Sequence, residues 1–433
     1  MGAWNLLAET VERIEPISAQ GRVSKIVGLM VEAAGPRASV GEYCHIITRD
    51  GRGLPAEVVG FRDSTTLLMP LGELEGIAPG DRVLSQRQKL TVPVGPGLLG
   101  RILNGLGHPM DDRPLQTEAA YPLQNKPPSA LLRPRIRDTL SVGVRTIDGI
   151  LTIGRGQRMG IFAGSGVGKS TLLGMMARNT VADINVIALI GERGRELRDF
   201  IEKDLGPEGL ARSVIIVATS DQPALVRLKA AFTATAIAEY FRDQGENVLL
   251  MMDSVTRFAM AQREVGLTVG EPPATRGYPP SVFALLPKLL ERSGMAEIGS
   301  ITGIYTVLVD GDDHNEPIAD SVRGILDGHI VLTRELAMQN QFPAIDILQS
   351  VSRVMNDVVN SEHKELAGKV REYIAIYRDA KDLIDIGAYT PGSNPKIDAS
   401  IAHMDRIQAF SRQRVDEYVT HQEMLQQLQE IFR

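Results

Sequence analysis

Three patterns of apolar and polar positions follow one another along the chain. Between residues 19 and 88, short apolar runs such as "EVVGF" and "TTLLMPLG" alternate with turns that contain glycine. Many short strands at this spacing are typical of a small barrel. We therefore predict a β-barrel domain over residues 19–88.

A helical pattern precedes the predicted barrel. Trp4, Leu7, Val11 and Ile14 recur at steps of three and four residues, which places them on one face of a helix. We predict a short amphipathic helix over residues 1–18. Its apolar face either binds a partner protein or packs on the barrel.

From residue 89 to 360, continuous apolar runs alternate with helical patterns. The runs are "RMGIFA", "INVIALIG", "SVIIVATS", "NVLLMMDS" and "ITGIYTVLV". Strands that are buried on both faces of a parallel sheet have this composition, and the alternation predicts right-handed βαβ units. We expect an α/β domain with a mostly parallel sheet.

The third pattern, residues 361–433, is helical. Val370, Tyr373, Ile374 and Tyr377 share one face of a predicted helix, and "GAYTPGSNP" then interrupts the pattern before further helical sequence. Because glycine and proline end helices, we predict a C-terminal α-helical domain of several helices.

Composition narrows the function classes. The chain has 433 residues, a formal net charge of −6 and one cysteine, Cys44. A mildly acidic chain is a poor candidate for a general nucleic-acid binder, and we expect no specific nucleic-acid partner. One cysteine excludes an internal disulfide and fits a reducing compartment, so we expect Cys44 to be a small core residue. No apolar stretch reaches the roughly 18 residues of a membrane span, and we expect a cytoplasmic protein.

The segment "AGSGVGKST" carries the clearest chemistry. It follows the predicted strand "RMGIFA" and opens a helical pattern, which is the strand–loop–helix context of a phosphate-binding loop. Ala163 stands where the usual pattern has glycine, but it precedes the turn itself. We predict that the loop binds the phosphates of a nucleotide through its backbone and Lys169 and, through the Ser170 hydroxyl, Mg²⁺. The predicted binding residues are Gly164, Ser165, Gly166, Val167, Gly168, Lys169, Ser170 and Thr171.

Two other predicted strands end in charged residues. Asp253 stands at the end of the apolar run in "NVLLMMDS". A carboxylate there suits a Walker B role toward Mg²⁺, and the alternative is a helix N-cap. Glu192 and Arg193 follow "IALIG", and ligands gather at the carboxyl ends of parallel strands. Glu192 is thus a candidate for polarising water and Arg193 for contacting phosphate, with a surface salt bridge as the alternative.

Two further candidates are weak when each is considered alone. Arg353 in "ILQSVSRVMND" has small neighbours, and a lone arginine is usually a solvated or structural charge. Phe342 in "NQFPAID" precedes a proline, and a core aromatic is the ordinary interpretation of such a residue.

Together the motifs resemble a known family. "AGSGVGKST", "GERGRE", "LLMMDSVTRFAMAQREVG", "GEPPATRGYPPSVFALLPKLLERSG" and "SVSRV" are similar to segments of the catalytic subunits of rotary ATPases. "GSITGIYTVLVDGDDHNEPIADSVRGILDGHIVLTRELA" is similar to the flagellar export branch. The resemblance covers nearly the whole chain. It implies a β-barrel, a RecA-like P-loop ATPase core, a helical C-terminal domain, and homohexamers with nucleotide at subunit interfaces.

The resemblance also implies roles for single residues. Lys169 and Ser170 hold phosphate and Mg²⁺, Asp253 is the Walker B acid, and Glu192 activates the attacking water.

Four other positions match the family pattern. Arg193 and Arg257 fall near the phosphates, and Phe342 takes the place of the aromatic that stacks on adenine. Arg353 matches the arginine finger that is donated to the nucleotide of the neighbouring subunit.

The export branch implies a function and partners. The ring hydrolyses ATP to release chaperones and to unfold and export flagellar proteins. The implied partners are a peripheral stalk or regulator protein at the N-terminus, a central stalk protein, membrane proteins of the export gate, and chaperone–cargo complexes. The implied location is the cytoplasmic side of the inner membrane.

Four other kinds of protein share parts of this pattern. A β-type subunit of a rotary ATP synthase carries a run of acids where this chain has "DLIDIGAYTPGSNPKIDAS". A regulatory ring subunit usually has glutamine in place of Glu192. A hexameric RNA translocase needs aromatic residues on its N-terminal domain, where this chain offers mainly Tyr43 and Phe61. The ATPase of a non-flagellar secretion injector is the nearest alternative, although "VLVDGDDHNEP" favours the flagellar branch.

Overall fold

The N-terminal part of the chain is a closed β-barrel. The computed structural model describes residues 19–111, 113–309, 313 and 315–433, so the helix predicted over residues 1–18 lies outside the described residues. Six strands close in the order β1-β2-β5-β4-β3-β6, with β6 paired back to β1. They are β1 (Gln20–Val27), β2 (Met30–Ala34), β3 (Glu42–Ile47), β4 (Gly53–Arg62), β5 (Thr65–Pro70) and β6 (Arg82–Lys89).

Small apolar side chains fill the barrel. Val31, Ile46, Val58 and Leu68 are fully buried in one cluster, because alternate positions of each strand point inward. Cys44 belongs to the same cluster, as expected for a small core residue.

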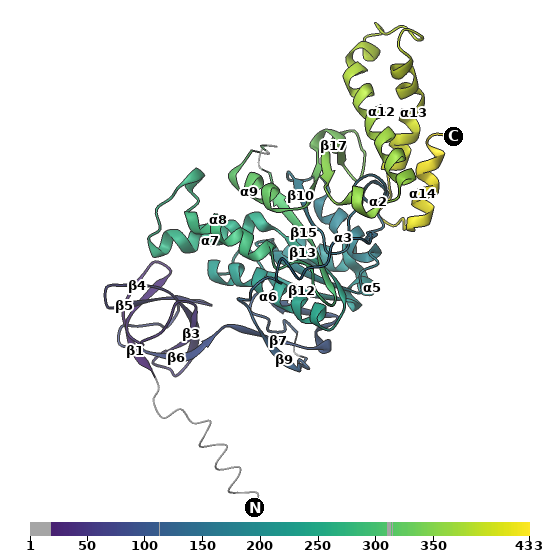
Figure 1. Cartoon of the computed structure of the whole chain (residues 1–433). Helices are drawn as coiled ribbons and strands as arrows, with labels where there is room; N and C mark the ends of the chain where they lie inside the picture. Colours follow the sequence, from purple (N-terminus) through teal and green to yellow (C-terminus); the bar gives the residue numbers. More distant parts are fainter. Residues whose placement is uncertain (1–18, 112, 310–312, 314) are drawn as a thin grey trace, which may run out of the picture.

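A single large sheet forms the centre of the molecule (Figure 1). Its order is β17-β16-β10-β15-β13-β11-β12-β8, and short β14 pairs with β15. The pairs among β16, β10, β15, β13, β11, β12 and β8 are parallel, whereas β17 and β14 pair in the antiparallel sense. The strands are β8 (Arg101–Asn104), β10 (Arg158–Ala163), β11 (Ile184–Ile190), β12 (Ser213–Ala218), β13 (Asn247–Asp253), β14 (Gly294–Met295), β15 (Ser300–Leu308), β16 (Gly328–Leu332) and β17 (Ile345–Ser352).

Helices cover both faces of this sheet, and each face has its own core. One face packs on α6 (Ala224–Asp243), α7 (Val255–Val269), α8 (Pro280–Leu290) and α9 (Pro317–Ile325). The other packs on α2 (Arg145–Ile150), α3 (Lys169–Asn179) and the π-helical turn η2 (Phe200–Leu205). The remaining shorter elements are β7 (Thr91–Val94), η1 (Pro96–Leu98), β9 (Ala119–Pro122), α4 (Gly194–Asp199), α5 (Gly206–Ala211), η3 (Thr275–Gly277) and α10 (Arg334–Met338).

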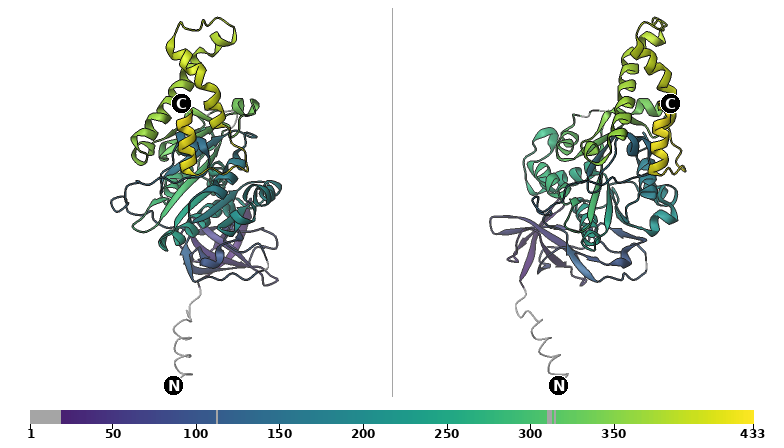
Figure 2. Two further views of the ribbon diagram at one scale, coloured as in Figure 1. Left: turned by 90° about the vertical axis from the view of Figure 1, so that its right-hand side faces the viewer. Right: turned by 45° about the vertical axis from the view of Figure 1, so that its right-hand side comes forward.

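The C-terminal part is helical and projects from the core on the side away from the barrel (Figures 1 and 2). After α11 (Met355–Val358), α12 (Ser361–Asp385) and α13 (Pro395–Ser411) form a long hairpin, and α14 (His421–Glu430) lies at its base. Val370 of α12 is fully buried there against Ile407 and Phe410. The predicted fold class, a barrel followed by an α/β core and a helical region, is confirmed.

A buried ion pair joins the barrel to the core. Lys229 of α6 lies 2.5 Å from the carboxylate of Glu57 in β4, and the two side chains are 5% and 8% exposed. Separating the two would leave charges buried without a partner, which is costly. This contact therefore holds the barrel against α6.

None of the helices in the described ranges is long and apolar enough to cross a membrane.

The most buried ion pair of the residues that the structure describes joins α6 to the end of α8. Arg292 and Glu239 are 1% and 0% exposed and form two hydrogen bonds of 2.8 and 2.7 Å. Arg292 also donates to the carbonyl of Leu123 at 2.6 Å. The pair thus ties the end of α8 and the segment after β9 to α6.

We expect Arg292→Met to lower the free energy of unfolding by about 3–5 kcal/mol, because it leaves the carboxylate of Glu239 buried without its partner. Urea unfolding followed by circular dichroism measures this change. Arg198→Met is the control: Arg198 and Glu202 are 79% and 56% exposed, and losing such a pair costs about 0.5 kcal/mol or less. Equal shifts in the two variants would contradict the expectation.

Candidate active site

The parallel strands bring their charged ends to one edge of the sheet. Leu189 of β11 is in register with Asp253 at the end of β13, and Glu192 follows β11 by two residues. The glycine-rich loop starts where β10 ends. The structure therefore gathers the loop, Glu192 and Asp253 at the carboxyl edge of one sheet, where ligands of such sheets bind.

The loop has the backbone of a phosphate cradle. Gly166 and Gly168 have φ of +79° and +87°, a region that residues with a Cβ atom rarely adopt. Gly168 is the N-cap of α3, and no side chain caps the helix. The first amide groups of α3 are thus open to an anion, which the positive end of the helix favours.

Ala163 does not disturb this arrangement. It is the last residue of β10, fully buried in the core beneath the loop. Its methyl group packs on the apolar side, away from the exposed Ser165 and Gly166.

Lys169 lies between two carboxylates. Its Nζ forms an ion pair with Oδ1 of Asp253 and lies 3.7 Å from Oε1 of Glu192. The same Oδ1 of Asp253 accepts a 2.7 Å hydrogen bond from the hydroxyl of Thr306 in β15. One ammonium facing two acids leaves this cluster ready for a cation or for a ligand that engages Lys169. The sequence reasoning missed Thr306, which only strand pairing places beside Asp253.

The pKa of the Glu192 carboxyl lies well above its usual range. Burial raises its pKa to about 7; the neighbouring carboxylate of Asp253 adds to the rise, and Lys169 opposes it. A carboxylate with a pKa near neutrality can exchange a proton with water at physiological pH.

Arg257 and Arg193 differ in placement. Arg257, in the first turn of α7, packs against Gly191 immediately before Glu192, and its buried Nε has no hydrogen-bond partner among the described residues. Such an unpaired donor fits an anionic ligand. Arg193 is instead largely exposed and lies 3.8 Å from Glu196.

A cavity of about 660 Å³ lies beside the loop. The ring of Phe342 forms part of its wall, next to Gly168, and is 40% exposed. The lining residues are Gly168, Thr171, Leu172, Met175, Asn340, Phe342, Pro343, Arg412, Gln413, Arg414, Val415, Asp416 and Glu417. A mostly apolar hollow of this size suits a small ligand.

The far wall of this cavity, residues 412–417, was missed from the sequence. Gln413 holds it in place: its backbone amide donates to the carbonyl of Phe342 at 2.9 Å, and its side chain donates to the carbonyl of Gly143 at 2.8 Å. No local motif marks this segment.

Arg353 lies at the opposite edge of the sheet. β17 is antiparallel to β16, with Ile345 beside Leu332 and Ser352 beside Gly328. The 8 residues of β17 span about 25 Å at roughly 3.3 Å per residue. The structure thus brings Phe342 to the loop but not Arg353, whose side chain is exposed at the amino edge.

Comparisons with known proteins agree with this architecture. Family models match the beta-barrel domain of the ATP synthase alpha/beta family over residues 23–86, its nucleotide-binding domain over 143–352, and the T3SS EscN ATPase C-terminal domain over 359–430. The chain is 56% identical to the flagellum-specific ATP synthase of Bacillus subtilis (strain 168), covering 95% of this chain and 94% of that protein. It is 52% identical to the type 3 secretion system ATPase of Xanthomonas euvesicatoria, covering 98% and 97%.

A solved structure is similar over the same length. The assembled ATPase EscN from the enteropathogenic E. coli type III secretion system superposes with a TM-score of 0.91, at 49% identity, covering 95% of this chain and all of that one. The chain therefore belongs to the ATP synthase alpha/beta family, in the group that contains the ATPases of type III export systems. It is an ATP hydrolase, as the sequence predicted.

We expect kcat/KM for ATP to fall about tenfold per pH unit below pH 7. Glu192 becomes protonated there, because its pKa is about 7, and a protonated carboxyl cannot accept a proton from water. Steady-state rates between pH 5.5 and 8.5 test this. Binding of a non-hydrolysable ATP analogue is the control: protonation removes a negative charge beside the phosphates, so its affinity should not fall. A flat rate profile down to pH 5.5 would contradict the assignment.

Proposed function

We propose that this protein is the Mg²⁺-dependent ATPase of a flagellar protein export apparatus and works as a homohexamer. The observation that carries the proposal is the division of the site. Lys169, Glu192 and Asp253 meet at one edge of the sheet, while Arg353 is exposed at the other edge. A site completed by the Arg353 of a neighbouring copy explains both placements.

Residues of one chain bind the nucleotide in this proposal. The loop from Gly164 to Thr171 surrounds the phosphates, Lys169 exchanges its contact with Asp253 for one to phosphate, and Phe342 contacts the base in the cavity. The unpaired Nε of Arg257 faces the same charge. Arg193 would have to move from its contact with Glu196 to do so.

The residues present fit Mg²⁺. This ion is commonly held by one or two protein oxygens together with substrate phosphates and water. Ser170 and Asp253 supply a hydroxyl and a carboxylate, and the described residues contain no cluster of three or more metal-binding side chains. When bound, Mg²⁺ neutralises charge on the phosphates.

Glu192 is the proposed proton acceptor. Its carboxylate polarises the attacking water and takes a proton from it, which a pKa of about 7 permits. Arg353 of the neighbouring copy stabilises the charge of the transition state. Arginine fingers contribute about 10³–10⁵ in rate.

The wider assembly is also proposed. EscN has been solved in complex with its central stalk EscO, which supports a central stalk partner here. We extend the proposal to a peripheral stalk or regulator protein bound by the N-terminal segment, to gate proteins at the inner membrane, and to chaperone–cargo complexes. The ring would use hydrolysis to release chaperones and unfold cargo on the cytoplasmic side of that membrane.

We expect Arg353→Ala and Glu192→Gln each to bind ATP normally and to lose turnover, the former by about 10³–10⁵-fold. Mixing the two inactive variants is the decisive measurement. Some interfaces in a mixed ring then combine an intact Glu192 with an intact Arg353, so activity should partly return. No recovery in rings that native mass shows to be mixed would place Arg353 outside the neighbouring site.

The flagellar assignment has its own test. The identity to the Bacillus subtilis relative, 56%, only slightly exceeds the 52% to the Xanthomonas injector relative. We expect this chain to restore swimming to Bacillus subtilis that lacks its flagellum-specific ATP synthase, with Glu192→Gln as the inactive control. Restored secretion in a Xanthomonas strain that lacks its ATPase, without restored swimming, would favour the injector.

A further inference from the structure

The backbone of Arg353 is held by Asp327. The amide of Arg353 donates to the carbonyl of Asp327 at 3.0 Å, and the same carbonyl accepts a 3.1 Å hydrogen bond from Nε2 of Gln157. Asp327 immediately precedes β16, and its carbonyl holds the backbone of Arg353 directly after the end of β17.

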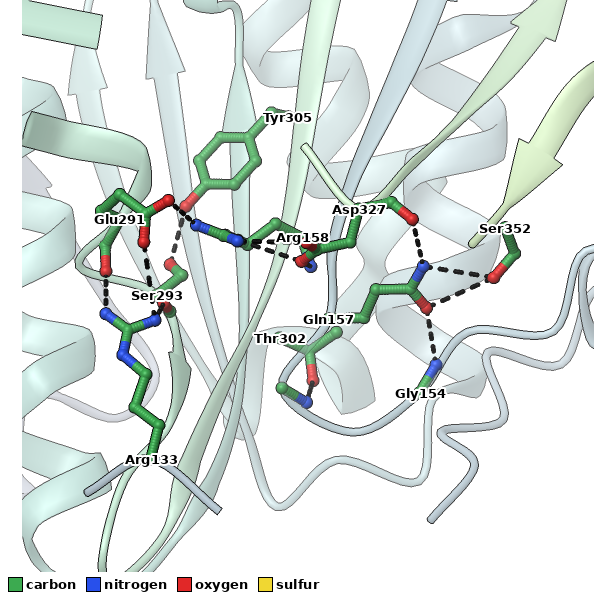
Figure 3. A network of polar contacts seen from close by, with 11 residues as sticks. Arg133, Gly154, Gln157, Arg158, Glu291, Ser293, Thr302, Tyr305, Asp327 and Ser352 are labelled. Carbon is green, nitrogen blue, oxygen red and sulfur yellow. Dashed lines mark hydrogen bonds and ion pairs between the residues drawn. The ribbon is translucent and has the colours of Figure 1, made fainter. Parts of the chain in front are cut away.

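Asp327 in turn forms an ion pair and hydrogen bonds with Arg158 (Figure 3). Nε and Nη2 of Arg158 each donate to the carboxylate of Asp327 at 3.0 Å, and the backbone amide of Arg158 donates to it at 3.1 Å. The side chains are 14% and 27% exposed. A two-pronged guanidinium–carboxylate contact fixes orientation as well as distance.

The residue before Arg353 is held by hydrogen bonds of its own side chain. The hydroxyl of Ser352 donates to the carbonyl of Thr152 at 2.8 Å and accepts a 3.2 Å hydrogen bond from Nε2 of Gln157. Gln157 is fully buried, and its Oε1 accepts from the amide of Gly154 at 2.8 Å. One amide side chain therefore bridges Asp327 and Ser352.

The network reaches further into the amino edge of the sheet. Arg158 also pairs with Glu291, which contacts Arg133 at 3.8 Å (Figure 3). Arg133 donates to the carbonyl of Ser293 at 3.0 Å. Asp327 is thus linked through Arg158 of β10 to Glu291, which directly follows α8.

The side chain of Arg353 differs from its hydrogen-bonded backbone. It is exposed and makes no hydrogen bond or ion pair with the described residues. An arginine whose backbone is fixed and whose guanidinium is unengaged is suited to enter a site on another molecule.

We propose that Asp327, held by Arg158 and Gln157, is a positioning residue for Arg353. The inference rests on the proposed role of Arg353 toward a neighbouring nucleotide. Asp327 does not touch that nucleotide; it sets the direction in which Arg353 leaves the sheet. A misplacement of about 1 Å in a catalytic group can cost roughly 100-fold in rate.

The test is a double-mutant cycle with Asp327→Asn and Arg353→Ala. Asparagine keeps the backbone carbonyl and the size of Asp327 but loses the charge and one acceptor that Arg158 uses. We expect kcat of the assembled enzyme to fall about 10- to 100-fold, with KM for ATP unchanged. In the Arg353→Ala background, Asp327→Asn should lower kcat no further, because residues that act as a unit are not additive.

Two further variants sharpen the test. Asp111→Asn disrupts another half-buried pair, between Arg101 and Asp111, which are 8% and 34% exposed, and should leave kcat near that of the wild type. Ser352→Ala removes a single hydroxyl and should lower kcat less than Asp327→Asn, again with no effect in the Arg353→Ala background. Ser352→Ala carries the test if Asp327→Asn fails to assemble.

The outcomes separate the two proposals. Wild-type turnover in Arg353→Ala overturns the finger, and the positioning role with it. If Arg353→Ala is slow but Asp327→Asn is as active as the wild type, or lowers kcat equally in both backgrounds, only the positioning role is overturned.

Discussion

The common direction of β10, β11 and β13 within one parallel sheet is the constraint on which the proposed nucleotide site depends. Because these strands run in the same direction, the loop after β10, Glu192 after β11 and Asp253 at the end of β13 reach one edge together. β17 runs the other way and carries Arg353 to the opposite edge. Strand direction thus separates the groups that we propose bind a chain's own ATP from Arg353, which we propose is offered to another copy. β10 runs from one edge of the sheet to the other, with Arg158 at its start and the loop at its end.

The parts predicted from the sequence are those with a local signal. The buried strands have continuous apolar runs, and the loop, Glu192 and Asp253 directly follow such runs, so their meeting followed from the rule for parallel sheets. Resemblance to a family, rather than spacing, singled out Phe342 and Arg353. That Arg353 serves the nucleotide of another copy was implied by the resemblance alone; its position at the opposite edge depends on the antiparallel pairing of β17 with β16, and the sequence "IDILQSVS" does not indicate strand direction.

Other features depend on contacts between distant segments and could not be predicted. One wall of the cavity beside the loop comes from residues 412–417, in which Gln413 is hydrogen-bonded to Phe342 and Gly143. The network around Asp327 joins residues that lie up to 200 positions apart in the sequence, each ordinary on its own. Patterns of a few residues report local geometry, whereas these contacts are set by how whole layers pack.

The cavity wall has a mechanical consequence. Residues 412–417 directly continue α13, and α13 runs without a break from the tip of the projecting hairpin to its base (Figure 1). Its 17 residues make a rod of about 25 Å at 1.5 Å per residue. A small tilt of α13 at this end would therefore displace the tip of the hairpin further than it displaces the cavity wall. The segment that lines the cavity and the projecting hairpin are one continuous stretch of chain.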